Sequence, residues 1–176
     1  SITEGWGNMV PEFFKGKPYV NRGIGGQTTP QMLIRFRPDV IDLQPKVVVI
    51  LAGTNDIAGN TGTTSEQTIV NNLISMAQLA KANGIKVVIS SIIPVFDYPW
   101  KPGLEPVAKI ASINQSLKTY AKNNGMVYLD YYTPMADERK GLKASLTYDG
   151  VHPNKEGYQL MAPLAEAAIK SALKMK

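Results

Sequence analysis

The stretch KVVVILAGTND, residues 46–56, decides the fold of this chain. Five consecutive apolar, strand-forming residues precede a run of small and polar ones. An unbroken apolar run, in place of alternation, is typical of a strand that is covered on both faces, as in a parallel sheet. Ligands of such sheets bind just beyond the carboxyl ends of the strands. A functional site is therefore expected among the residues that end this run, and Asn55 is one of them.

Three further segments carry similar apolar runs. IKVVISSIIPV (85–95) and MVYLDYY (126–132) have the same strand-forming character as the first stretch. KPYVNRGIGG (17–26) is predicted as a short strand that runs into a glycine turn. The sequence thus indicates strands at four places along the chain.

Helical patterns fill the gaps between these runs. The segment TTPQMLIRFRPDVIDL (28–43) is predicted to begin with Thr29 as its N-cap and Pro30 at the first helical position. Pro38 should break or restart this helix, since an interior proline removes a backbone hydrogen bond.

Three more helices are predicted further along. Thr64 and Gln67 could form a capping box for a helix over 64–84, with Gly84 placed to end it. A helix over 105–124 has the same apolar spacing and is followed by Gly125. The last predicted helix runs from Lys155 to Met175, with Asn154 as its cap and Pro163 as a kink.

Strands that alternate with helices predict an α/β fold with a parallel sheet between two layers of helices. A chain of 176 residues is the size of one domain and can bury a substantial core. We therefore predict a single domain over residues 1–176, built as a three-layer α/β/α sandwich.

The composition argues against several classes of function. The net charge is +5, but the basic residues are scattered and only Arg35-Phe36-Arg37 forms a tight group, so nucleic acid is not an expected partner. No apolar run has the eighteen or so residues of a membrane span. The chain has no cysteine, which excludes disulfides, thiolate metal sites and a cysteine nucleophile.

Familiar cofactor motifs are also missing. GIGGQT (23–28) lacks the last glycine of the dinucleotide-binding pattern, and neither a P-loop nor a G-x-S-x-G elbow occurs. With a single histidine, a transition-metal site would depend on carboxylates, which make a poor zinc site. We expect no cofactor and no metal.

What remains is a set of residues suited to nucleophilic catalysis. Ester hydrolysis needs an activated hydroxyl, a base, a carboxylate that orients the base, and donors for the oxyanion. TYDGVHPN (147–154) offers Asp149 and His152 as carboxylate and base. Asn55 offers an amide, and the Gly25-Gly26 turn offers backbone N–H groups. Taken singly, each of these residues also fits an ordinary turn.

Four blocks of the sequence, in this order, resemble the SGNH or GDSL hydrolase family. They are SITEGWGN (1–8), NRGIGGQTT (21–29), GTND (53–56) and YDGVHP (148–153). The resemblance implies a flavodoxin-like parallel sheet and a catalytic triad of Ser1, Asp149 and His152. It also implies that the backbone amide of Ser1 joins Gly26 and Asn55 as oxyanion donors.

The chain departs from the family pattern at two places. The Gly-Asp that this family carries before its serine, and the first strand that precedes them, are absent from the given chain. We therefore expect a domain that is incomplete at its N-terminus, and on that ground we favour an extracytoplasmic location. Gln27 stands where relatives resembling the acetylhydrolase of platelet-activating factor have aspartate, so that group's substrate is not transferred.

The aromatic residues form a second group of candidates. Phe96, Tyr98 and Trp100 lie in PVFDYPWKPG (94–103), directly after a predicted strand. They could wall an acyl pocket or stack on a sugar ring, or they could pin the loop from inside the core. Trp6 is predicted to face the core near Ser1.

The function we predict is that of a serine esterase acting on a small-molecule carboxylic ester through an acyl-serine intermediate. A small chain without a lid-like insertion favours short acyl groups, acetyl above all. Alternatives in the same family are a carbohydrate O-deacetylase and a lysophospholipase-type acylhydrolase. An N-terminal nucleophile hydrolase would need antiparallel sheets, and a non-catalytic flavodoxin-like binding module would leave YDGVHP without a role. The sequence indicates no oligomeric state.

Overall fold

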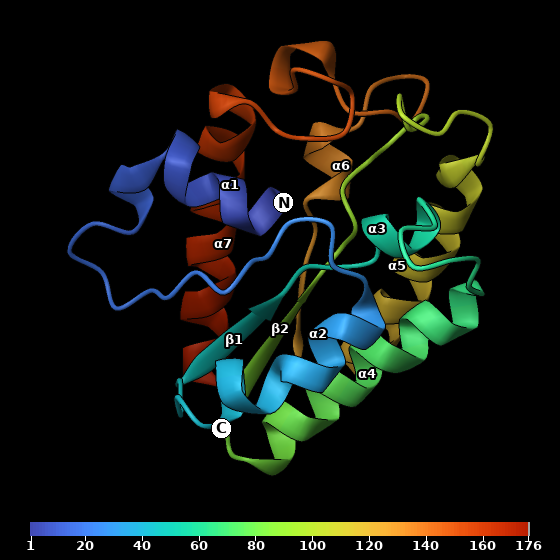
Figure 1. The fold of residues 1–176 in the computed structure, drawn as a ribbon. Helices are drawn as coiled ribbons and strands as arrows, with labels where there is room; N and C mark the ends of the chain where they lie inside the picture. Colours follow the sequence, from blue (N-terminus) through green and yellow to red (C-terminus); the bar gives the residue numbers. More distant parts are fainter. Residues whose placement is uncertain (176) are drawn as a thin grey trace.

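Three parallel strands form the sheet in residues 1–175, the part of the chain that the computed structural model describes (Figure 1). The strands lie in the order β1 (Val47–Ile50), β2 (Lys86–Ser90) and β3 (Val127–Leu129). Val47 is paired with Lys86, and Val88 with Val127. Strands that follow one another in the chain are thus neighbours in the sheet, each reached through a helical crossover.

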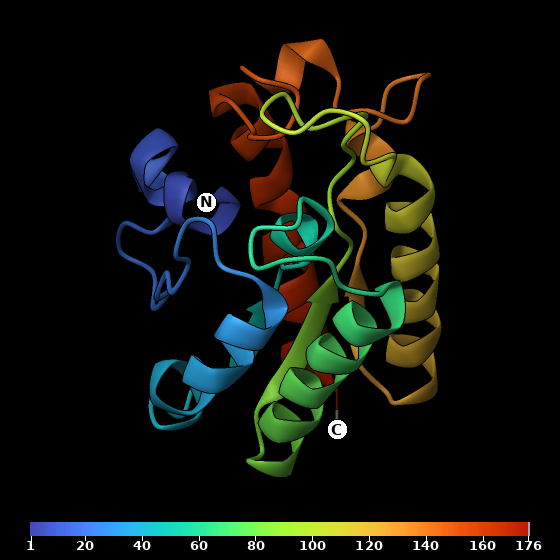
Figure 2. The same ribbon diagram turned by 45° about the vertical axis from the view of Figure 1, so that its right-hand side comes forward.

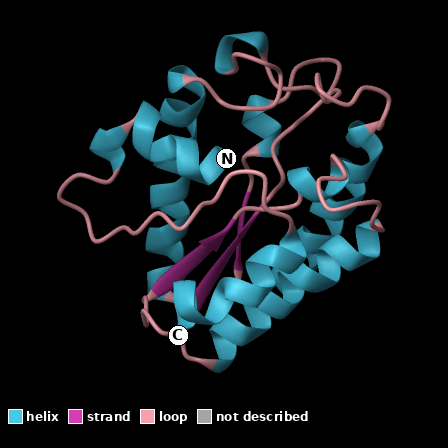
Figure 3. Ribbon diagram, viewed as in Figure 1, coloured by secondary structure: helices cyan, strands magenta, loops and turns pink. Residues whose placement is uncertain are grey.

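Helices cover both faces of this sheet (Figures 1 and 3). On one face lie α4 (Glu66–Ala82) and α5 (Pro106–Asn123), and on the other lies α7 (Lys155–Lys174). Val88 and Ile89 point to opposite faces of β2, and their exposed fractions are 0% and 1%. The predicted three-layer α/β/α sandwich is confirmed.

The two faces of the sheet enclose two separate hydrophobic cores. Leu73, Met76 and Leu117 are fully buried between the sheet and the α4–α5 layer. Met161 and Ala165 of α7 belong to the second core, on the opposite face. Both helical layers therefore owe their position to burial of apolar side chains against the strands.

The shorter helices lie around this sandwich. They are α1 (Ile2–Met9), a 3₁₀ turn (Pro11–Phe13), α2 (Thr29–Phe36) with a π-helical turn (Arg37–Ile41), α3 (Thr54–Ile57), α6 (Tyr132–Met135) and a 3₁₀ turn (Ala144–Leu146). The π-helical turn contains Pro38, where the sequence predicts that the helix breaks.

Helix α1 packs on α7 through aromatic side chains. Trp6 is buried, with its ring stacked on Phe13 at 4.6 Å and tilted against Tyr158 at 5.6 Å. The Tyr158 hydroxyl donates a hydrogen bond of 2.7 Å to the carbonyl oxygen of Ile2. The core-facing position predicted for Trp6 is confirmed.

Residues 17–26 do not form the predicted strand. No strand pairs with this segment among the described residues, and Val20 is 70% exposed. Side chains hold the segment in place: the ring of Tyr19 packs against Phe13 at 5.4 Å, and the side-chain Oδ1 of Asn21 accepts from the Gly23 amide at 2.9 Å. An apolar run forms a strand only where a partner completes the ladder.

Two predicted helix caps are wrong by one residue. The N-cap of α2 is Thr28, which forms a capping box with Gln31, because Thr29 is bound to Asp56. The N-cap of α4 is Ser65, whose hydroxyl accepts from the Thr68 amide at 3.1 Å.

The other predicted helix ends agree with the structure. Asn154 caps α7 by accepting from the Gly157 amide at 2.9 Å. Gly84 and Gly125 follow α4 and α5 with φ of +74° and +63°, a conformation that glycine adopts without strain.

All three strands point their carboxyl ends toward one end of the molecule. Ser1, α3 and the loops over 94–103 and 136–154 gather at that end, as both views show (Figures 1 and 2). This is the edge of the sheet at which the sequence predicts a site. Among the described residues, no helix combines the length and apolar character that a membrane span requires.

Candidate active site

A chain of hydrogen bonds joins Ser1, His152 and Asp149. The hydroxyl oxygen of Ser1 lies 3.0 Å from Nε2 of His152. Nδ1 of the same ring lies 2.7 Å from Oδ2 of Asp149. The structure thus brings together two residues that are far apart in the sequence, with the serine before α1 and the histidine in the loop before α7.

The turn over 147–152 fixes the orientation of the imidazole. Oδ1 of Asp149 accepts from the backbone amides of Val151, at 2.9 Å, and His152, at 2.7 Å. The Thr147 hydroxyl accepts from the Gly150 amide at 2.9 Å and donates to the His152 carbonyl at 2.7 Å. One carboxylate therefore holds both the backbone and the ring of His152.

The same contacts determine the ionisation of Asp149. Burial alone would raise the pKa of its carboxyl, but hydrogen bonds from His152 and Val151 outweigh burial and lower the pKa below its ordinary value. Asp149 is accordingly a carboxylate at neutral pH, as a group that orients a protonated imidazole must be.

The Gly25-Gly26 turn lies beside the serine. A Cβ on Gly25 would lie 3.8 Å from Cβ of Ser1. The Gly25 amide donates to the Glu4 carboxylate at 2.9 Å, and the Gly26 carbonyl accepts from the Asn60 side chain at 3.1 Å. Gly26 has φ of +75°, and no acceptor for its amide lies within the described part of the chain. That amide therefore has no partner among the described residues.

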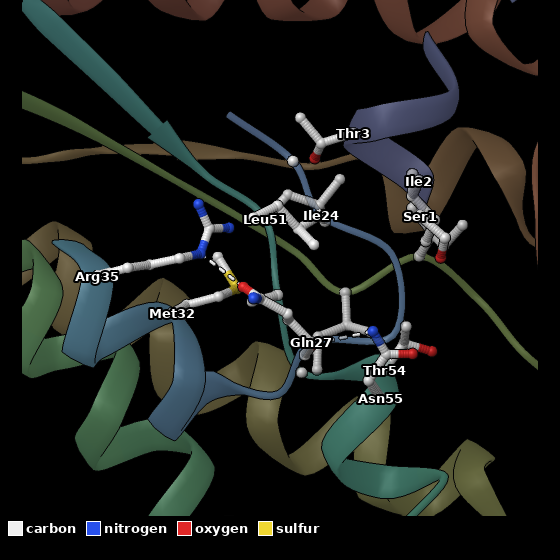
Figure 4. Close-up of a pocket in the computed structure, with 15 residues that line it drawn as sticks. Ser1, Ile2, Thr3, Ile24, Gln27, Met32, Arg35, Leu51, Thr54 and Asn55 are labelled. Atoms are coloured by element: carbon white, nitrogen blue, oxygen red, sulfur yellow. Dashed lines mark hydrogen bonds between the residues drawn. The ribbon is translucent and has the colours of Figure 1, made fainter. Parts of the chain in front are cut away.

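Asn55 faces the same pocket as Ser1 (Figure 4). Its Nδ2 donates a hydrogen bond of 2.8 Å to the carbonyl oxygen of Gln27, which fixes the plane of the amide. A side-chain amide nitrogen carries two hydrogens, so one is left for a ligand. The side chain of Gln27 accepts from Nε of Arg35 and so points away from Ser1 (Figure 4).

Asp56, the neighbour of Asn55, is an anchor that the sequence analysis missed. It is 4% exposed, and its two oxygens accept from the Thr29 amide at 3.0 Å each. The Thr29 hydroxyl donates to Oδ1 at 2.6 Å, which ties α2 to α3. Burial raises the pKa of Asp56, and the bonds from Thr29 offset only part of this. In the sequence, the aspartate of the block GTND (53–56) was the signal that could have indicated this role.

The three aromatic residues of the loop over 94–103 have different positions. Tyr98 is fully buried, its hydroxyl donates to the Thr54 carbonyl at 3.0 Å, and burial raises its pKa to about 12. It supports α3 from within the core, which is the pinning role that the sequence also allowed, and it lines a second pocket together with Phe96 and Arg139. Phe96 is 49% exposed and lies 4.6 Å from the guanidinium of Arg139. Trp100 is 50% exposed, with its ring 5.8 Å from that of His152.

Tyr148 is a second residue at the site that the sequence analysis did not single out. Its ring lies 5.9 Å from that of His152, with only 9° between the two planes, and 63% of the residue is exposed. Tyr148 belongs to the block YDGVHP, but a sequence cannot tell on which side of the histidine its ring lies.

Across residues 1–175, no three acidic or histidine side chains lie close enough to hold a metal ion.

Known proteins share both sequence and fold with this chain. The family model for GDSL-like lipases and acylhydrolases matches residues 1–160. A Bacteroides fragilis protein designated an acylhydrolase is 48% identical, with a TM-score of 0.95 over 98% of this chain and 84% of that one. A GDSL-like lipase from Bacteroides thetaiotaomicron is also 48% identical, with a TM-score of 0.94 over 97% of this chain and 84% of the lipase.

A curated relative is an uncharacterized lipoprotein of Bacillus subtilis, YqeF. It is 35% identical over 96 residues, which make up 52% of this chain and 40% of the lipoprotein. The match thus spans less than half the length of that relative.

Proposed function

This chain belongs to the GDSL-like lipase/acylhydrolase family, and from that premise we propose that it hydrolyses carboxylic esters through an acyl-serine intermediate. The observation that carries the proposal is the hydrogen-bonded chain from Ser1 through His152 to Asp149. A nucleophile, a base and an orienting carboxylate in this arrangement are what acyl transfer to serine requires.

Acylation begins with the neutral imidazole. Nδ1–H donates to Asp149, which leaves Nε2 as the acceptor for the Ser1 hydroxyl proton. As Oγ attacks the ester carbonyl carbon, the proton passes to Nε2, and the charge of Asp149 stabilises the imidazolium. Nε2 then protonates the leaving alcohol as the tetrahedral intermediate collapses to the acyl-serine. Water attacks this acyl group with the same base and releases the acid.

The oxyanion of the intermediate needs donors that are in place before the reaction. We assign this role to the amides of Gly26 and Ser1 and to Nδ2 of Asn55. Support comes from the unpaired amide of Gly26 and from the bond that orients Asn55 on Gln27. Donors held in this way need no reorganisation when the charge develops.

The acyl group is proposed to be short. The pocket beside Ser1 and Asn55 has a free volume of about 50 Å³ for a water-sized sphere. This is room for about three or four waters, enough for an acetyl group but not for a long chain. The hydrolysis rate should therefore fall steeply along a series of p-nitrophenyl esters from acetate to octanoate.

A fluorophosphonate probe tests the nucleophile. It should label Ser1, and Ser1→Ala should abolish both labelling and esterase activity, whereas Ser116→Ala, at an exposed position of α5, should change neither. Ser90 and Ser91 are buried and hydrogen-bonded, so neither should react. Labelling that persists in Ser1→Ala would refute the assignment.

We further propose an extracytoplasmic location, supported by the name of the Bacillus subtilis relative as a lipoprotein. Fractionation of cells that produce the full natural protein should recover the esterase activity outside the cytoplasm. Activity confined to the cytoplasmic fraction would contradict this.

A further inference from the structure

Two half-exposed aromatic rings flank the proposed base. Trp100 lies 5.8 Å from the His152 ring with 31° between the planes, and Tyr148 lies 5.9 Å away with 9° between them. They come from the loops over 94–103 and 136–154, which lie side by side at the carboxyl end of the sheet (Figure 2). Both rings lie beside the imidazole. Even so, Trp100 is 50% exposed and Tyr148 is 63% exposed.

Large aromatic side chains exposed in this way need an explanation, since burial would stabilise the fold. The chain can bury its aromatics, because Tyr98 of the same loop is fully buried. The Trp100 ring lies 5.5 Å from that of Tyr98, so it is supported from beneath and little side-chain entropy is lost when a ligand covers it.

The position of the two rings determines which part of a substrate they meet. Nε2 of His152 must reach both the serine and the oxygen of the leaving alcohol. Groups packed around this imidazole should therefore contact the alcohol, whereas the pocket lined by Ser1 and Asn55 is the one proposed for the acyl group.

Exposed polar residues next to these aromatic residues favour a carbohydrate as the alcohol part of the substrate. Lys101 and Asn60 are exposed polar residues on the side of α3, with the Lys101 ammonium next to Gly59. A pyranose ring has C–H groups on its faces that pack on aromatic rings and hydroxyls at its edge that bond to polar neighbours or water. An alkyl chain would instead need a continuous apolar wall.

We propose that Trp100 and Tyr148 form a stacking platform for the sugar ring of an O-acylated pyranoside. The platform defines the alcohol part of the substrate, and this inference rests on the proposed esterase function. Neither residue takes part in a bond-making step, so both determine specificity.

The test compares a cyclic polyol ester with an acyclic one. Values of kcat/KM for glucose pentaacetate and glycerol triacetate are measured in the wild type and in Trp100→Ala, Tyr148→Ala and Tyr148→Phe. The ratio of the two values should fall roughly three- to tenfold in each alanine variant, which is the range of one aromatic stacking contact. Tyr148→Phe keeps the ring and should keep the ratio. Ile34→Ala, on the exposed face of α2, is the matched control.

The outcomes separate this inference from the proposed function. Hydrolysis of neither ester by the wild type would refute the esterase proposal itself. If both esters are cleaved and the alanine variants leave the ratio unchanged, or slow both esters equally, the rings only support His152 and the platform is refuted. Phenyl acetate is measured as a third substrate, and a larger loss for it than for glucose pentaacetate would indicate an aryl alcohol and overturn the carbohydrate assignment.

Discussion

His152 is the only histidine of the chain, and each of its ring nitrogens has a different partner. A structural histidine would need only one of these bonds. Here Asp149 uses one oxygen for the ring and the other for two backbone amides, so that removing its charge leaves much of the turn in place. The role of each residue can therefore be tested separately from folding.

Asp149→Asn should lower kcat on p-nitrophenyl acetate by about 10⁴, the loss caused by the same change in a serine protease. His152→Ala should cost at least as much, and the double variant little more, because triad residues act as a unit. Asp130→Asn is the control, since the Asp130 carboxylate accepts from the amide and the hydroxyl of Thr133 and has no bond to Ser1 or His152. If the factors by which the two single variants lower kcat multiply in the double variant, the two residues do not act as a triad.

Asn55→Ala should lower kcat by roughly 10²–10³ with little change in KM, because an oxyanion forms only in the transition state. Steady-state kinetics with p-nitrophenyl acetate measure both constants. A raised KM at constant kcat would mean that Asn55 binds the substrate and not the oxyanion.

At the scale of elements, α1 and the glycine turn are held together at the nucleophile. The Glu4 carboxylate on α1 accepts from the Gly25 amide, and the Gly23 backbone lies so close to the Glu4 amide that a Cβ there would overlap it. These contacts tie α1 to the glycine turn, so we expect Glu4 to position the serine relative to the proposed Gly26 donor.

Glu4→Ala should therefore lower kcat about three- to tenfold at nearly constant KM, as expected for loss of one hydrogen bond of about 1 kcal/mol. Glu4→Gln retains an acceptor oxygen and should stay close to the wild type. Glu12→Ala, on the exposed 3₁₀ turn, controls for the loss of a surface charge. Equal loss in Glu4→Gln would show that charge, and not the bond to Gly25, matters.

The elements predicted from the sequence were those set by local pattern. The apolar runs at 46–56, 85–95 and 126–132 contain the three strands. Strand β2 is buried on both faces, whereas β1 and β3 are only partly buried and Val49 of β1 is 36% exposed. The run at 17–26 failed because strand formation also depends on a partner that is remote in the sequence. The caps were misplaced where two hydroxyl residues adjoin, at Thr28-Thr29 and at Thr64-Ser65, since either could cap by residue type.

The residues of the site also fall into two groups: those that local sequence blocks identify and those that only three-dimensional contacts reveal. Ser1, Asn55, Asp149 and His152 were identified through blocks of residues, and the structure places them at one edge of the sheet. Glu4 and Tyr148 were missed because their significance lies in contacts with Gly25 and His152. Tyr98 and Trp100 have similar side chains two positions apart, and only packing distinguishes the buried one from the exposed one.

At the scale of the whole molecule, the two cores serve different parts of the site. The α4–α5 core lies under α3, which carries Asn55, while the α7 core supports α1 and thus Ser1. A cavity remote from the site should reduce stability without changing the chemistry.

Leu117→Ala, at a fully buried position of α5, should lower the free energy of unfolding by about 2–5 kcal/mol. Well below the melting temperature, kcat should be unchanged. Urea unfolding and steady-state kinetics measure the two quantities, with Ile34→Ala as the exposed control. A loss of kcat in step with stability would mean that the cores and the site are coupled.

The attachment of α1 to α7 has a consequence for how the protein loses its activity. A helix of eight residues is not stable alone, and α1 is held on α7 by the Trp6 stack and by the Tyr158 bond to Ile2. Detachment of this unit would carry the nucleophile away from its base while every strand stays paired. Activity would then be lost at a lower temperature or denaturant concentration than the one that unfolds the domain. It would return on cooling. Such a detached state would be inactive, reversible and still folded.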